Sequence, residues 1–77
     1  MQINTQLAKA FNRAVTTAEN INNDGSINWN FVDADCYMDL ADINSDLPAN
    51  IDYIKQFDYL ADCYTGKVTL ADRLVTA

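Results

Sequence analysis

Residues 29–46 read W-N-F-V-D-A-D-C-Y-M-D-L-A-D-I-N-S-D, and this segment predicts a helix that begins near residues 26–30 and ends at about Ile43. One apolar set has the three- and four-residue spacing of a buried helix face: Trp29, Val32, Cys36, Leu40 and Ile43. Ile27, Trp29 and Phe31 also alternate with polar residues, so a short strand over 27–32 is the competing interpretation. We favour the helix because a strand would give the residues that follow, Asp33, Asp35 and Tyr37, unfavourable positions.

Four carboxylates form a second side of the same predicted helix. They are Asp35, Asp39, Asp42 and Asp46, spaced by four, three and four positions. At about 100° per residue they lie within roughly 60° of one another, if the helix extends through Asp46. A third side is small and apolar: Phe31, Ala34, Met38 and Ala41. Either the helix is central and packs on both apolar sides, or the third side meets a partner.

Helices are also predicted on both sides of this segment. Residues 4–22 carry apolar residues at helical spacing, and Asn4 or Thr5 can cap their start. Pro48 suits the first turn of a third helix that ends at Gly66. A short fourth helix is predicted from Thr69. With 77 residues and few glycines or prolines, residues 1–77 are predicted to be one small acidic all-α domain, a three-helix bundle with a short fourth C-terminal helix.

The acidic residues are concentrated in the middle of the chain. Between Arg13 and Lys55 there is no basic residue, and there are eight acidic ones: Glu19, Asp24, Asp33, Asp35, Asp39, Asp42, Asp46 and Asp52. A field of one sign repels nucleic acid and anionic membranes, and it attracts cations or basic protein surfaces. We therefore expect no direct nucleic-acid binding and no membrane binding.

The chemistry-bearing residue types are scarce. The chain has no histidine, no serine or cysteine beside a plausible base and no glycine-rich phosphate loop, so we expect neither an enzyme nor a cofactor. Cys36 and Cys63 have no third cysteine or histidine to complete a zinc site. No apolar leader follows Met1 and no segment has transmembrane length, which favours a cytoplasmic protein with reduced thiols.

Residues 20–28 read N-I-N-N-D-G-S-I-N. They resemble the first nine positions of an EF-hand loop, and more closely the calcium loop of dockerin domains. The resemblance implies Asn20, Asn22 and Asp24 as weak candidate metal ligands. Phe31 stands at position 12, where those families have a carboxylate, and a fainter copy over residues 42–53 lacks this ligand too. A degenerate calcium-binding helical pair is therefore an alternative, and the preferred interpretation has no metal site.

The preferred function is a non-catalytic acidic protein that binds and blocks a basic, nucleic-acid-binding surface of a host protein. Carboxylates held on a small helical body can imitate nucleic-acid phosphates. Small acidic helical proteins of this type resemble the inhibitors that phages and mobile elements use, which would place this one in the host cytoplasm. The predicted partner-binding residues are Asp35, Asp39, Asp42, Asp46, Phe31, Met38 and Trp29, with Tyr37 and Tyr59 as further candidate anchors. A small homodimeric regulatory subunit is the other alternative.

Overall fold

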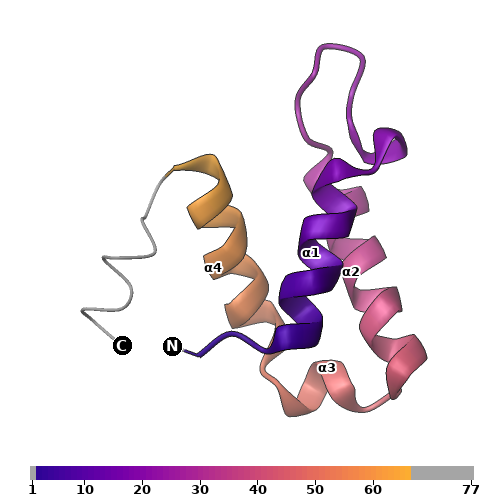
Figure 1. The fold of residues 1–77 in the computed structure, drawn as a ribbon, viewed down its shortest axis with the longest axis vertical. Coiled ribbons are helices and arrows are strands. Elements are labelled where there is room, and N and C mark those ends of the chain that lie inside the picture. Colours follow the sequence, from indigo (N-terminus) through magenta and orange to yellow (C-terminus); the bar gives the residue numbers. More distant parts are fainter. Residues whose placement is uncertain (1, 67–77) are drawn as a thin grey trace.

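The computed structural model describes residues 2–66, and this part of the chain is all-α (Figure 1). The helices follow in the order α1 (Thr5–Thr16), α2 (Trp29–Ile43), α3 (Leu47–Asn50) and α4 (Tyr53–Thr65), with the 3-10 turn η1 (Ala18–Asn20) after α1. Among the described residues, no helix has the length and apolar character that crossing a bilayer requires. The helix predicted from Thr69 lies outside the described residues.

Asparagine side chains start the first two long helices. Asn4 Oδ1 accepts hydrogen bonds from the amides of Gln6, at 2.9 Å, and Leu7, at 3.1 Å. Asn28 Oδ1 accepts one from the Phe31 amide at 3.3 Å. These bonds satisfy amide groups that the first helical turn leaves without intrahelical partners. The helix beginning predicted for residues 26–30 is thus confirmed, and Ile27 makes only an isolated antiparallel bridge to Ile21.

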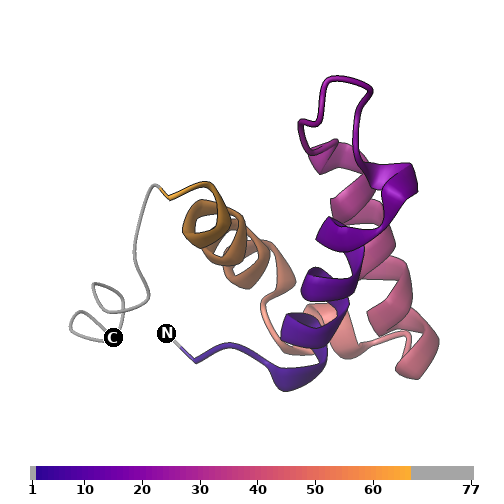
Figure 2. The ribbon, with the colours of Figure 1, turned by 45° about the horizontal axis from the view of Figure 1, so that its top comes forward.

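The core lies between α1, α2 and α4. Figures 1 and 2 show α1 and α2 side by side, with α3 at one end of the pair leading into α4. The buried residues are Leu7, Ala10, Phe11, Ala14 and Val15 of α1, Val32, Cys36 and Leu40 of α2, and Tyr53 and Phe57 of α4. Burying each large apolar side chain contributes about 1.5–3 kcal/mol. The face of α2 predicted to be buried therefore forms the core, except at its two ends.

An aromatic cluster joins the three long helices. The Phe11 ring lies 6.2 Å from Trp29, 5.7 Å from Phe57 and 6.1 Å from Tyr64, measured between ring centroids. Such pairs contribute about 0.5–1.5 kcal/mol beyond the area that they bury. Trp29 is half-buried in this cluster, so it serves the fold and is not a free anchor for a partner. Tyr59 is also buried, at 4% exposure, and is not available either.

The first helix ends earlier than the predicted limit near residue 22. The hydroxyls of Thr16 and Thr17 both donate to the Arg13 carbonyl, at 3.0 and 2.8 Å, and Thr17 has an extended backbone. Such side-chain bonds offer helix carbonyls an alternative partner and favour termination. The chain then passes through η1 into a hairpin closed by the Ile21–Ile27 bridge, and Gly25 takes the positive φ of 88° that its turn requires.

The third predicted helix is divided into α3 and α4. Pro48 lies in the first turn of α3, as predicted, and Gly66 ends α4 in a left-handed conformation. Between the two helices, Asp52 has a φ of 57° and a ψ of 58°. A left-handed residue cannot continue a right-handed helix, so the chain changes direction at this position.

Candidate functional site

The predicted row of four carboxylates is divided by the structure. Asp35 Oδ2 accepts a hydrogen bond from Asn20 Nδ2 at 2.9 Å, and Asp39 Oδ2 lies 3.3 Å from Arg13 Nη2. Both aspartates are half-buried and have partners from the α1–η1 side of the molecule. Their carboxylates hold α2 against that side. Each carboxylate thus has a partner within the chain, which the sequence interpretation did not include.

The other half of the row is exposed, but it does not stay on one helix. α2 ends at Ile43, where Asn44 takes an extended conformation and its Oδ1 accepts a hydrogen bond from the Asp46 amide at 2.9 Å. Asp46 therefore precedes α3 and does not continue the row. The helix ends at Ile43, as predicted, and the condition for a row of four carboxylates, a helix that extends through Asp46, is not met. Asp42 and Asp46 are both exposed. Two solvent-facing carboxylates remain at this end of α2.

Asn20 ties the loop that resembles a calcium site to the body of the protein. Its side chain is 5% exposed, and its Nδ2 donates to the Ala14 carbonyl at 3.0 Å as well as to Asp35. The Asn20 carbonyl accepts a hydrogen bond from the Asn28 amide at 2.8 Å. Asn20 therefore has a structural function, which is to join α1, the hairpin and α2.

The other two candidate ligands stabilise the turn of the hairpin. Asn22 Nδ2 donates to Ser26 Oγ at 2.9 Å. Asp24 Oδ1 accepts hydrogen bonds from Ser26 Oγ at 2.6 Å and from the Ser26 amide at 3.0 Å, and these two bonds lower the pKa of the Asp24 carboxyl. Within residues 2–66, no three side chains of the types His, Cys, Asp and Glu are grouped so that they could hold a metal ion.

An apolar strip is exposed on the outer side of α2. We define the strip as Phe31, Ala34, Met38 and Ala41. Phe31 is 56% exposed and Met38 is 63% exposed, whereas Ala41 is half-buried. Large exposed apolar side chains that lie together on one face are typical of interaction surfaces. The strip therefore matches the sequence interpretation in which this side of the helix is free to meet a partner.

A groove lies beside the strip, between α2 and the start of α4. It has a volume of about 420 Å³, and Ala34, Tyr37, Met38, Tyr53 and Ile54 provide its apolar lining. Ile54 is 75% exposed. A second hollow of about 230 Å³ shares Tyr37, Tyr53 and Ile54 and extends toward Pro48. Together, the strip and the groove form a continuous apolar surface over two helices.

Two carboxylates that the sequence interpretation left aside line this surface. Asp33 lines the groove and Asp52 lines the adjoining hollow. Tyr53 Oη donates to Asp33 Oδ1 at 2.6 Å and to the Asp33 carbonyl at 2.9 Å, which fixes the position of Asp33. Burial, and then the hydrogen bond to Asp33, raise the pKa of Tyr53, so its hydroxyl remains a donor. The unbroken helical pattern across residues 48–65 gave no signal that Asp52 would adjoin α2.

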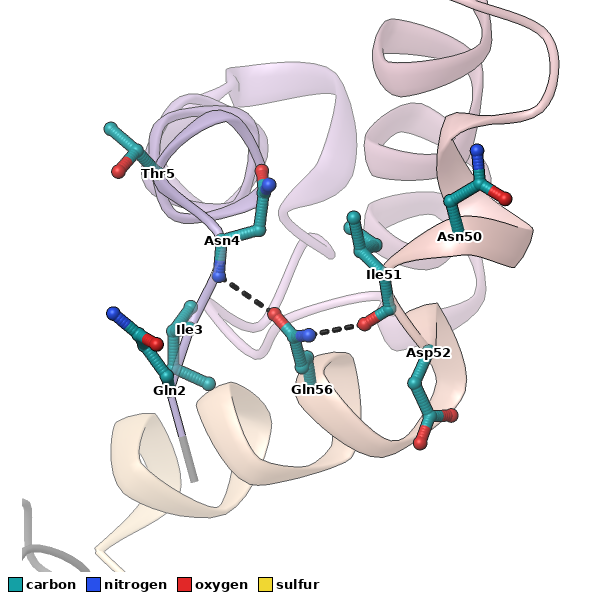
Figure 3. A pocket seen from close by; sticks show the side chains of 8 residues that line it. All are labelled: Gln2, Ile3, Asn4, Thr5, Asn50, Ile51, Asp52 and Gln56. Carbon is teal, nitrogen blue, oxygen red and sulfur yellow. Dashed lines mark hydrogen bonds between the residues drawn. The ribbon is translucent and has the colours of Figure 1, made fainter.

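A polar hollow lies on another side of α4, and hydrogen bonds between the residues that line it fix the position of the groove (Figure 3). It has a volume of about 490 Å³ and lies between the N-terminal residues and the α3–α4 turn. The Asn4 amide donates to Gln56 Oε1 at 2.7 Å, and Gln56 Nε2 donates to the Ile51 carbonyl. These bonds attach the start of α4, and with it Tyr53 and Ile54, to the start of α1.

No family model, curated protein or solved structure matches the chain.

Proposed function

We propose that this chain is a non-catalytic acidic interaction protein that binds and blocks a basic, nucleic-acid-binding surface of a partner protein. In this respect it would act in the manner of the DNA-mimic inhibitors of phages and mobile elements. The observation that supports the proposal is the exposed apolar strip and groove with aspartates around them, in a segment without basic residues. Asp33, Asp42, Asp46 and Asp52 are all exposed, and residues 14–54 contain no lysine, arginine or histidine.

The charge would select the partner and bring it into contact. Surface carboxylates of one sign create a field that extends about one Debye length, roughly 8–10 Å at physiological salt, and accelerates association with basic surfaces. Each exposed ion pair contributes only about 0–1 kcal/mol, so charge alone gives a weak complex. Basic nucleic-acid-binding surfaces carry the complementary field.

The apolar strip would supply the affinity that ion pairs do not. Phe31 and Met38 have more than half of their surface exposed, and burying side chains of this type fully contributes about 1.5–3 kcal/mol each. Interfaces depend on a few such desolvated anchors with polar groups around them. The arrangement on α2 combines both parts within a few turns of one helix.

We also propose an arrangement of the helices and a place in the cell where the protein acts. α1, α2 and α4 act as a three-helix bundle that keeps the surface rigid. The protein acts in the cytoplasm, and in the host cytoplasm if a phage encodes it.

The test is capture of the partner by the immobilised chain, followed by competition with nucleic acid. We expect partners from the cells in which the chain is made to be released by duplex DNA or RNA and by about 500 mM salt. A variant with Asp42→Asn and Asp46→Asn should capture several-fold less, whereas Glu19→Gln, an exposed change on η1, should not. Asp35 and Asp39 are unsuitable for this test because their neutralisation would also remove bonds to Asn20 and Arg13. Captured protein that resists both nucleic acid and salt would contradict the proposal.

A further inference from the structure

We infer that the apolar surface of α2 and α4 binds one basic amphipathic helix of the partner. This inference rests on the proposed function and specifies the part of the partner that is bound. The strip residues are separated by three, four and three positions, which is the spacing with which one helix packs along another. The surface thus has the periodicity of a helix-binding site and not only an apolar character.

The dimensions of the surface set the length of the bound helix. Phe31 and Ala41 are ten residues apart on α2, which corresponds to about 15 Å along the helix axis. The groove of about 420 Å³ lies beside this line, with Tyr37 and Ile54 available to cover the side of an incoming helix. About three turns of a partner helix, with large apolar residues on one face, would therefore cover the strip and fill the groove.

The negative charges on the two edges of the surface select a bound helix of positive charge. On one edge, the exposed Asp42 follows the strip residue Met38 by four positions, which places it one turn further along the same side of the helix. On the other edge, Asp33 and Asp52 line the groove and the hollow next to it. Lys55, beside Ile54, is the basic residue closest in sequence to the surface. Lysines or arginines flanking the apolar face of the bound helix would meet carboxylates on both edges.

The same charges argue against a second copy of the chain as the occupant. A symmetric pair formed through this surface would bring together four acidic edges, because residues 14–54 offer no basic residue to oppose them. Like charges across an interface cost free energy and suppress wrong pairings. The small homodimer proposed from the sequence is therefore less favourable on this surface than a complex with a basic helix.

The experiment uses two peptides of about 18 residues with identical composition, rich in leucine and lysine. In one peptide the leucines recur at helical spacing on one face, and in the other the same residues are scrambled. Binding of each labelled peptide to the full chain is measured by fluorescence anisotropy at low and high salt. We expect the patterned peptide to bind at least about tenfold more tightly than the scrambled one.

Substitutions on α2 that leave its charge unchanged test whether the apolar strip itself binds the peptide. Met38→Gln and Ala34→Gln change exposed residues of the strip, so the chain should still fold, and the preference for the patterned peptide should be lost. Ile43→Gln is the matched control, because Ile43 is 59% exposed on the same helix but outside the strip. This control should leave the preference unchanged.

Three outcomes would overturn the inference, and they have different consequences for the proposed function. Equal, salt-sensitive binding of both peptides would exclude the helix-binding site and leave the charge-driven function standing. If neither peptide bound at low salt, the proposed function would be removed as well. Sedimentation showing a dimer that Met38→Gln dissociates would make a second copy the occupant.

Discussion

The two sides of α2 use the same residue types for different purposes. On the side that faces α1 and η1, Asp35 and Asp39 are half-buried and bound to Asn20 and Arg13. On the outer side, Asp42 is exposed one turn beyond Met38, and both Met38 and Phe31 have more than half of their surface in solvent. An aspartate at a given helical spacing thus stabilises the fold or remains available to a partner according to what lies opposite it.

This difference separates two measurable properties. Changes on the inner side of α2 should lower the free energy of unfolding, because they remove contacts between elements. Changes on the outer side should leave stability almost unaltered and act on binding alone.

The largest effect is expected from two phenylalanines. Phe11 is 3% exposed at the centre of the aromatic cluster, and Phe31 is 56% exposed on the strip. Phe11→Ala should cost about 3–5 kcal/mol of unfolding free energy because it leaves a cavity, whereas Phe31→Ala should stay within about 0.5 kcal/mol of the wild type. The measurement is urea unfolding followed by circular dichroism. Since a domain of this size has only about 3–5 kcal/mol in total, Phe11→Leu provides a milder version that should still fold. Equal losses at the two positions would contradict the assignment of the core.

A smaller loss is expected at Asn20. Asn20→Ala removes the Nδ2 group that bonds the Ala14 carbonyl and Asp35, and it leaves these acceptors without that donor. The expected cost is about 1–3 kcal/mol in the same urea titration. Asn30→Ala is the control because Asn30 is exposed on the groove side of α2. If Asn30→Ala lowered the free energy of unfolding as much as Asn20→Ala does, the distinction between the inner and outer sides of α2 would be wrong.

Alkaline pH should lower the free energy of unfolding through the buried thiol of Cys36 on α2. Burial, with the charge of Asp35 as the next cause, raises the pKa of Cys36 from its ordinary value of 9.0 to about 12. The unfolded chain therefore releases this proton at lower pH than the folded chain does. The contribution of this thiol to the free energy of unfolding should be fully present below the ordinary pKa. It should fall as the pH rises toward about 12, by up to about 1.4 kcal/mol per pH unit.

The control for this titration is the other described cysteine. Both Cys36 and Cys63 are free thiols, but Cys36 is buried and Cys63 is only half-buried. Urea unfolding on either side of the ordinary pKa should show a shallower pH dependence for Cys36→Ala than for the wild type. Cys63→Ala should retain the wild-type slope. Identical slopes in all three proteins would show that Cys36 does not control the alkaline transition.

The smallest effect is expected at the ion pair between α1 and α2. Arg13 Nη2 lies 3.3 Å from Asp39 Oδ2, and the Arg13 side chain is 67% exposed. Arg13→Gln should cost at most about 1 kcal/mol at low salt, and less at high salt, because solvent screens the pair. Lys9→Gln, an exposed change on the same helix, is the comparison. The pair has no stabilising role if the two variants unfold at the same urea concentration in low salt.

Helical spacing was sufficient to predict an all-α chain, the position of α2 and much of the core. The buried face of α2 follows from the positions of Val32, Cys36 and Leu40, whereas the spacing of Phe31, Ala34 and Met38 gave a second apolar face without deciding that it is exposed. These features depend on local periodicity, which each segment carries in its own residues.

The division of the carboxylate row could not be predicted in the same way. It depends on Asn20 and Arg13, which lie 15 and 26 positions from their aspartate partners in the sequence, and periodicity within α2 contains no information about them. The groove depends on the left-handed Asp52, at which the chain turns from α3 into α4. This turn is set by a backbone conformation that an apolar pattern does not specify.

The most direct test of the account compares two double variants that remove the same number of charges. One carries Asp42→Asn near the C-terminal end of α2 and Asp46→Asn just beyond that end, and the other carries Glu19→Gln and Asp58→Asn, which are exposed elsewhere. Binding of the patterned basic peptide is measured at about 50 mM salt. The account predicts that the first variant binds about three- to tenfold more weakly than the wild type, and that the second changes little. Equal weakening in both variants would show that net charge alone attracts the peptide, and it would contradict a binding site on the outer face of α2.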